Sequence, residues 1–61
     1  MTIVLNDATF DAALDHARRT DLDRGSAPML VDRRINHLGG GRGVYIRDPD
    51  GIAYEFFTAV P

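Results

Sequence analysis

The side chains best suited to chemistry lie near the C-terminal end of the sequence. Glu55 is the only glutamate, beside eight aspartates, and it sits within the apolar run 52–60. A carboxylate at this position could act as a general base or bind a metal ion. Tyr45 and Arg47 are two residues apart in the run 44–47, so in a strand they share a face where a hydroxyl and a guanidinium could bind an anionic substrate group. For all three residues the alternative is a solvated position on an open strand face.

The other reactive residue types point to no second site. His16 is expected on the solvated side of a helix, and His37 lies in a glycine-rich loop, either solvated or at the rim of a partner subunit's cleft. Ser26 has no base close to it in sequence. The run 38–43, LGGGRG, has neither the spacing nor the following helix of a phosphate-binding loop. Without cysteine, the chain has no disulfide and no thiolate metal site.

The last strand determines which sheet face carries Glu55. Alternation with a period of two puts Tyr54 and its bulky partners on one face and Glu55 with smaller residues on the other. The first set is Tyr54, Phe56, Thr58 and Val60, and the second is Ala53, Glu55, Phe57 and Ala59. The bulky set suits packing under a helix. Small residues beside a carboxylate leave space, as in a pocket floor, although an open solvated face has the same pattern.

The remaining segments predict one helix and three further strands. A helix beginning at Asn6, Asp7 or Thr9 and ending near Arg19 or Thr20 carries one apolar stripe, formed by Phe10, Ala13, Leu14 and Ala17. The other elements are a strand at 2–5, a connection at 21–28, a strand at 29–35, a loop at 36–43, a strand at 44–47, a tight turn at 48–51 and a strand at 52–60. The order is β-α-β-β-β, and its single helix can cover only one face of the sheet.

Length and charge exclude several classes of protein. The 61 residues form one domain at most, and a core this small usually needs a partner subunit or a metal. The net charge of −2 argues against nucleic acid or an anionic membrane as a partner. There is no apolar run of the roughly 20 residues that a membrane span needs, and no secretory signal. We therefore expect a cytoplasmic protein with no membrane contact.

The segment 39–55, GGGRGVYIRDPDGIAYE, resembles the closing hairpin of the vicinal oxygen chelate superfamily. This superfamily includes glyoxalase I, bleomycin-resistance proteins, fosfomycin-resistance enzymes and extradiol dioxygenases. The segment 9–19, TFDAALDHARR, also resembles the helix of the family's βαβββ module. The resemblance covers nearly the whole chain. It implies an α+β fold over 1–61, with one helix on one face of a mostly antiparallel sheet, that pairs with a second module by dimerisation.

The same resemblance implies roles for individual residues. Glu55 stands four residues after the glycine of DPDG, where metal-dependent members carry a ligand, so it is the expected catalytic and metal-binding residue. The metal would be a divalent ion of Fe, Mn, Ni, Zn or Mg. Tyr45 matches a substrate-facing tyrosine, and Arg47 joins it as a substrate-binding candidate. His37 is the second candidate metal ligand. The family's first-strand histidine is missing, because Thr2 occupies that region, so one chain has no complete metal site.

Three functions are compatible with these features. The first is a divalent-metal-dependent lyase or dioxygenase that acts on a small oxygen-rich substrate. The second is a non-catalytic protein of the bleomycin-resistance type that binds a small molecule, such as a drug, without metal. The third is an isolated half-module, complete or cut from a longer gene product, that dimerises and has little activity.

Overall fold

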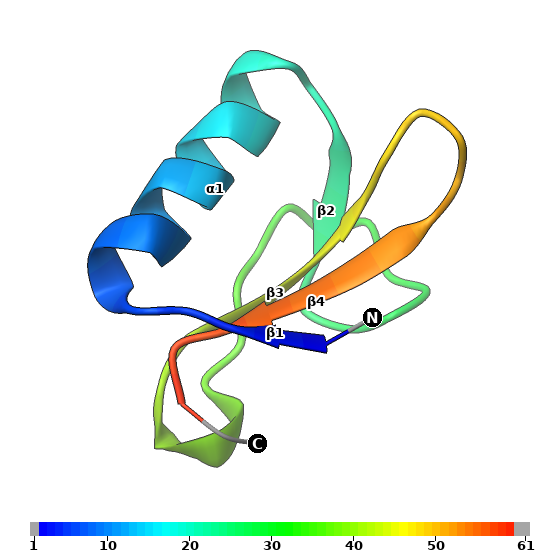
Figure 1. Ribbon diagram of the computed structural model, residues 1–61. Coiled ribbons are helices and arrows are strands. Elements are labelled where there is room, and N and C mark those ends of the chain that lie inside the picture. Colours follow the sequence, from blue (N-terminus) through cyan, green and yellow to red (C-terminus); the bar gives the residue numbers. More distant parts are fainter. Residues whose placement is uncertain (1, 60–61) are drawn as a thin grey trace.

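The computed structural model describes residues 2–59, which form one helix packed on a four-stranded sheet (Figure 1). The elements are β1 (Thr2–Val4), α1 (Asp7–Arg19), β2 (Asp23–Gly25), a short 3-10 helix η1 (Leu38–Gly40), β3 (Gly43–Arg47) and β4 (Ala53–Phe57). The strand order is β1-β4-β3-β2, with β1 parallel to β4 and the other neighbours antiparallel. The predicted α+β class is confirmed, and the arrangement is compatible with a βαβββ module.

The helix forms where the sequence predicted it, because both ends are capped and one stripe is apolar. The Asn6 side chain accepts a hydrogen bond from the Thr9 amide at 2.8 Å, and Thr20 caps the other end. Phe10, Leu14 and Ala17 are buried against Val44 and Ile46 of β3, together forming the core. Within residues 2–59, no helix is both long and apolar enough to cross a membrane.

The predicted division of the sheet faces is confirmed. Phe56 packs against the core on the helix side, in register with Val44. Glu55 is paired with Tyr45, so both side chains face away from α1. Phe57 shares that second face and is only 1% exposed, in edge-to-face contact with the Tyr45 ring at 6.1 Å. Val60, which the alternation assigned to the helix side, lies outside the described residues.

The predicted strand at 29–35 is wrong, because side-chain hydrogen bonds bend this segment into a loop. The Asp32 carboxylate accepts hydrogen bonds from the amides of Ser26 at 3.0 Å and Arg34 at 2.9 Å, and from the Ser26 hydroxyl at 2.6 Å. Arg33 has a φ of 61°, in the left-handed region that a strand does not use. Local bonds to one carboxylate therefore replace the hydrogen-bond ladder of a strand.

The second strand lies earlier, inside the segment predicted to be a connection. Asp23–Gly25 pairs antiparallel with β3, and Gly25 is opposite Tyr45. A Cβ atom at Gly25 would overlap the carbonyl oxygen of Leu30, so the loop crosses directly over the end of β2. Only glycine permits this close approach, which closes the loop onto the sheet.

The turn between β3 and β4 has the predicted form. The Gly51 amide donates to the Asp48 carbonyl at 2.9 Å, and the Ile52 amide donates to the Asp48 carboxylate at 2.9 Å. Gly51 has a φ of 87°, which glycine adopts without strain. Of the strands that it joins, β3 begins one residue earlier than predicted, at Gly43, and β4 is shorter than predicted, since it stops at Phe57.

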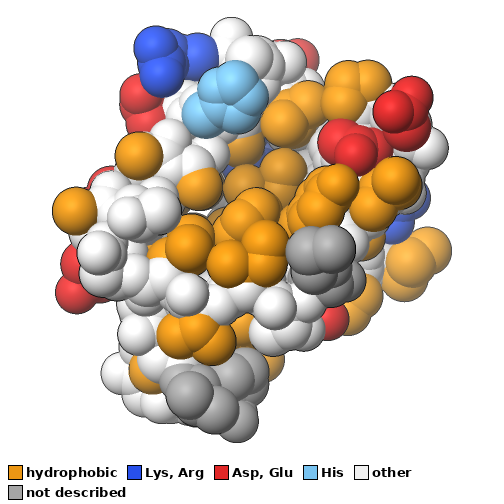
Figure 2. Space-filling model, in the orientation of Figure 1, with side chains coloured by type: hydrophobic (Ala, Val, Ile, Leu, Met, Phe, Trp, Pro, Cys, Tyr) orange, Lys and Arg blue, Asp and Glu red, His pale blue; other side chains and the backbone are white. Residues whose placement is uncertain are grey.

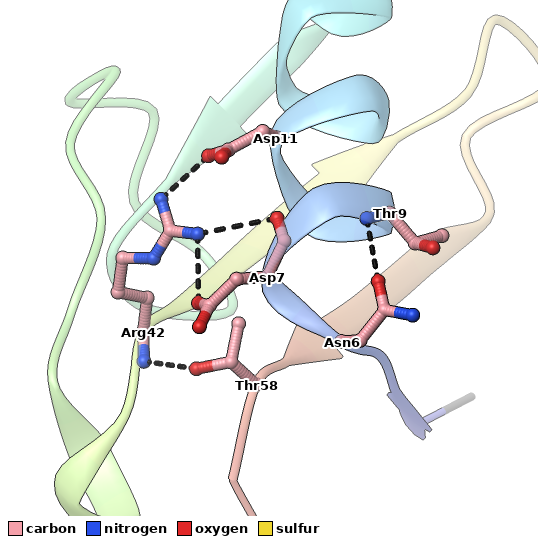
Figure 3. Close-up of polar contacts among 6 residues, drawn as sticks. All are labelled: Asn6, Asp7, Thr9, Asp11, Arg42 and Thr58. Atoms are coloured by element: carbon pink, nitrogen blue, oxygen red, sulfur yellow. Dashed lines mark hydrogen bonds and ion pairs between the residues drawn. The ribbon is translucent and has the colours of Figure 1, made fainter.

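Arg42 ties the start of the helix to the end of the sheet (Figure 3). Its guanidinium lies 2.6 Å from the Asp11 carboxylate and 2.9 Å from the Asp7 carboxylate, and it also stacks over the Phe10 ring at 4.6 Å. Its backbone amide donates to the Thr58 hydroxyl at 2.7 Å. These contacts raise the pKa of Arg42, chiefly through the hydrogen bond with Asp11. The Arg42 side chain is partly shielded from water, so this network holds more firmly than an exposed pair.

Replacing Arg42 with methionine should lower the free energy of unfolding by clearly more than breaking an exposed ion pair does, because two charge-assisted hydrogen bonds and a cation–π contact are lost. The matched control is Arg19→Met, which breaks the exposed pair with Asp15 and should cost under about 0.5 kcal/mol. Urea unfolding of both variants, followed by circular dichroism, measures the difference. Equal losses in the two variants would contradict the role given to Arg42.

Acid should loosen the loop through Asp32. The hydrogen bond from Ser26, with that from Arg34, lowers the pKa of Asp32 in the folded state. Its carboxylate therefore stabilises the fold above its ordinary pKa of about 3.9, and this contribution is lost as the pH falls through the lower folded pKa. Asp32→Asn should make stability less sensitive to pH in that acid range, as measured by urea unfolding midpoints. Asp50→Asn, in the exposed turn, is the control, and identical acid sensitivity in wild type and Asp32→Asn would refute the prediction.

Candidate functional site

The candidate site is a row of side chains that crosses the sheet on the face away from α1. The registers pair Thr2 with Glu55, Glu55 with Tyr45, and Tyr45 with Gly25. Residues in direct register point to the same side of a sheet, so Glu55 lies between a hydroxyl and a phenol. Tyr45 and Glu55 were predicted in separate strands, and the structure brings them together.

The environment of Tyr45 favours the protonated form of its hydroxyl. Burial raises the pKa of Tyr45, and the negative charge of Glu55 raises it further. A protonated phenol is a hydrogen-bond donor, whereas an ionised carboxylate only accepts. The row therefore presents a donor and an acceptor side by side, which is a suitable arrangement for binding an oxygen-bearing substrate.

Arg47 lies one step further along the same face. It is in register with Ala53 and Asp23, and it is half-buried. Its guanidinium donates to the Met29 sulfur at 3.7 Å, a weak contact, and no ion pair to Arg47 occurs within residues 2–59. The methyl group of Ala53 leaves the guanidinium room to meet an anion. Arg47 and Tyr45 thus share the face that the strand alternation assigned to them.

The loop after β2 forms one wall of this face. A hollow of about 10 Å³ separates the loop from the sheet, and this volume is too small for a substrate. It is lined by Asp23, Arg24, Pro28, Leu30, Val31, Tyr45, Ile46, Arg47 and Ala53. At the opposite edge, Val4 is in register with Phe57 and is 52% exposed. The face is therefore walled at the β2 edge and open at the β1 edge.

His37 lies outside the row. It is exposed and immediately precedes η1, beyond the bridge between Asn36 and Gly43. Across residues 2–59 there is no group of three or more His, Cys, Asp or Glu side chains that could hold a metal ion. Thr2 is the residue beside Glu55, and its hydroxyl is a poor substitute for an imidazole ligand. The donors of this part of the chain thus do not complete a metal site on their own.

Sequence reasoning missed two features of the site. It did not identify Gly25 as a member of the row, because β2 was predicted to be a connection. It also did not identify the Asp32 loop as the wall. The available signal was Gly25 with Ser26 directly after it and Asp32 six residues further on. Serine and aspartate side chains often form hydrogen bonds with nearby backbone groups in loops.

The link between Glu55 and Tyr45 predicts a titration effect. Glu55→Gln removes the negative charge, so the pKa of Tyr45 should fall while staying above its ordinary value of about 10, because the burial remains. NMR of protein labelled with ¹³C at the tyrosine Cζ position measures this, with Tyr45→Phe assigning the signal. Asp50→Asn should leave the Tyr45 titration unchanged. An unchanged Tyr45 pKa in Glu55→Gln would show that the two groups are not in contact.

Comparison with known proteins shows similarity to two named oxidases. No protein-family model matches the chain, and no curated protein matches it. Among solved structures, Oxidase ChaP-H1 is similar over 100% of this chain and 49% of its own length, with a TM-score of 0.85 and 35% identity. Oxidase ChaP-H2 is similar over 100% of this chain and 48% of its own length, with a TM-score of 0.84 and 30% identity. The chain thus spans about half the length of these two structures, and its fold is similar to the part of each that it matches.

Proposed function

We propose that this chain is one half of a small-molecule site in an oxygen-using enzyme of the vicinal oxygen chelate type, a metal-dependent lyase or dioxygenase. The observation that carries the proposal is the row on the open sheet face, where Glu55 lies beside the protonated phenol of Tyr45. The similarity to two oxidases at 30–35% identity supports the choice of an oxygen-using enzyme.

Each residue of the site has a role in this proposal. Arg47 pairs with an anionic oxygen of the substrate and fixes its position over Ala53. Tyr45 donates a hydrogen bond to a second substrate oxygen and stabilises negative charge that develops there. Glu55 accepts a proton from the substrate or donates its carboxylate to a divalent ion. Such an ion, when bound, would supply Lewis-acid stabilisation of the same oxygen.

The site needs a second module to close it. The chain spans half of the similar structures, and its open face contains a hollow too small for a substrate. In our proposal a second copy covers the β1 edge, where Val4 is exposed, and forms a homodimer. The partner copy would then supply donors that residues 2–59 lack beside Glu55, with His37 at the rim as the candidate.

A non-catalytic binding protein of the bleomycin-resistance type is the second candidate. It is favoured by Thr2, which stands beside Glu55 where a metal site would need a stronger ligand. It is also favoured by the lack of a three-donor cluster in the described part of the chain. In this version Tyr45 and Arg47 bind a small molecule without metal, and Glu55 is only a hydrogen-bond acceptor.

Calorimetric titration with Mn²⁺ tests the proposal directly. The wild-type protein should bind the ion, and Glu55→Gln should weaken binding by more than about tenfold, since even loss of an outer-shell partner costs about that much. The control Asp50→Asn removes an exposed carboxylate from the turn and should bind like wild type.

Equal binding of Mn²⁺ by wild type and Glu55→Gln, or no binding by either, would reject the metal-dependent enzyme. In the latter case the binding protein predicts thermal stabilisation by a small aromatic ligand that persists in chelator. No stabilisation by any ligand would leave the half-module of low activity as the remaining description.

A further inference from the structure

The helix side of the sheet contains a groove that the open-face site does not use. The helix packs over β3, where Val44 and Ile46 are buried, whereas Tyr54 and Phe56 of β4 stay half-exposed. The groove between α1 and β4 has a volume of about 240 Å³. Its lining is Ala13, His16, Ala17, Leu22, Ile46, Asp48, Tyr54 and Phe56. Clefts that bind drug-sized ligands measure about 300–1,000 Å³, so this groove suits a smaller organic molecule.

The body of the groove is apolar and partly aromatic. The rings of Tyr54 and Phe56 lie stacked, with their centroids 6.1 Å apart. Most of the remaining lining is aliphatic, from Ala17, Leu22 and Ile46 among others. Figure 2 looks into the groove and shows hydrophobic side chains along it. A ligand with an apolar body would be removed from water here, and the faces of the two rings attract positive charge.

The acidic group that lines this groove is the carboxylate of Asp48, which directly follows β3. Its Oδ1 accepts a hydrogen bond from the Ile52 amide at 2.9 Å, whereas its Oδ2 receives only a long one of 3.5 Å from the Tyr54 hydroxyl. Within residues 2–59, no arginine or histidine forms an ion pair with Asp48. A carboxylate has about four acceptor positions, so Oδ2 can accept a stronger bond from a cationic donor in the groove.

The surface next to the groove adds to this negative charge. A second, more open hollow of about 370 Å³ shares Leu22 and Asp48 with the groove. It is lined by Thr20, Asp21, Leu22, Asp23, Arg47, Asp48, Pro49 and Gly51. Its three aspartates outnumber its single arginine, even though Asp21 also pairs with Arg33. Figure 2 shows acidic side chains over the turn between β3 and β4, beside the apolar strip. This end of the groove therefore attracts a cation and repels an anion.

We propose that this groove is a second ligand site, which binds a small primary amine with an aromatic or aliphatic body. The ammonium group donates a hydrogen bond to Oδ2 of Asp48, and the body lies against Leu22, Ile46 and Phe56. The site is on the opposite side of the sheet from Glu55, so its occupancy does not depend on the function proposed for the open face.

The test compares three probes that share a phenyl ring and a four-carbon chain: 4-phenylbutylamine, 4-phenylbutan-1-ol and 4-phenylbutyrate. NMR titration of the wild-type protein is done at pH 8, where histidine side chains are ordinarily neutral. The amine should bind at least about threefold more tightly than the alcohol, because a charge-assisted hydrogen bond is stronger than a neutral one. The acid should bind more weakly than the alcohol. Equal binding of amine and alcohol, or tightest binding of the acid, would overturn the proposal.

Variants assign the preference to one carboxylate. Asp48→Asn keeps a side-chain oxygen for the Ile52 amide but removes the charge, so it should abolish the preference for the amine. The control Asp50→Asn removes an exposed carboxylate from the same turn and should keep the preference. An unchanged preference in Asp48→Asn would overturn the proposal. Loss of the preference in Glu55→Gln would place the amine on the opposite face and would also overturn it.

A second variant keeps the test decisive if Asp48→Asn does not fold. Ala13→Phe fills the groove from α1 and should block the amine and the alcohol. Its matched control is Ala12→Phe, at an exposed position of the same helix, which should bind both probes like wild type. Binding of the amine by Ala13→Phe at wild-type strength would overturn the proposal. The proposal is equally wrong if raising the protein concentration shifts the Tyr54 and Phe56 signals and excludes the probes, because a second copy would then occupy the groove.

Discussion

The parallel pairing of β1 with β4 is the constraint on which the rest of the structure depends. Because β2 runs antiparallel to β3, and β3 antiparallel to β4, β1 and β2 are parallel strands at opposite edges of the sheet. Parallel strands need a crossover connection, and α1 provides it on one face. The β3–β4 hairpin fits between the two edges. This arrangement makes β3 and β4 the two central strands and leaves one face of the sheet uncovered by the helix (Figure 1). Tyr45 and Glu55 lie opposite each other in these strands, on the uncovered face.

The two faces of the sheet consequently differ in chemistry. Towards α1, the core is apolar, and Arg24 of β2 is the buried charged side chain among residues 2–59. Away from α1, the central row combines a carboxylate, a phenol and a hydroxyl. The loop held by Asp32 closes the β2 edge of this face, while the β1 edge stays open. One module of a two-module protein would have such a site, walled at one edge and open at the other. This agrees with the proposal that a second copy covers the β1 edge.

Local signals in the sequence were sufficient for the helix, the turn and the central hairpin. Each of these elements is specified by residues at most four positions apart. Asn6 caps the helix, the apolar stripe that begins at Phe10 repeats every three or four residues, and the turn is closed by the hydrogen bond between Asp48 and Gly51. The strand at 29–35 was wrongly predicted because its apolar residues suit a strand, whereas the Asp32 carboxylate bonds backbone amides on both sides of it. Gly25 in turn looked like a breaker, although it is the point where the loop crosses β2.

The site could be predicted only in part, because its geometry depends on contacts between distant residues. Alternation placed Glu55 on the correct face, but its neighbours Thr2 and Tyr45 follow from strand registers that local patterns do not contain. The Arg42 network could not be predicted from local patterns either, since its partner Asp11 lies 31 residues away in the sequence. The buried Nε atom of Arg24, which has no acceptor within residues 2–59, is likewise visible only after folding, because it depends on which groups surround the guanidinium.

Nuclear Overhauser contacts between the β strands measure the central claim most directly. In the isolated chain in solution, we expect contacts from Glu55 to Thr2 on one side and to Tyr45 on the other. If Ile3 takes the place of Thr2 opposite Glu55, or Val44 takes the place of Tyr45, the strand register is shifted. The absence of any contact from Glu55 to β1 would likewise contradict the observed pairing. The carboxylate would then point towards the helix or lie apart from the phenol, and the proposed site would not exist.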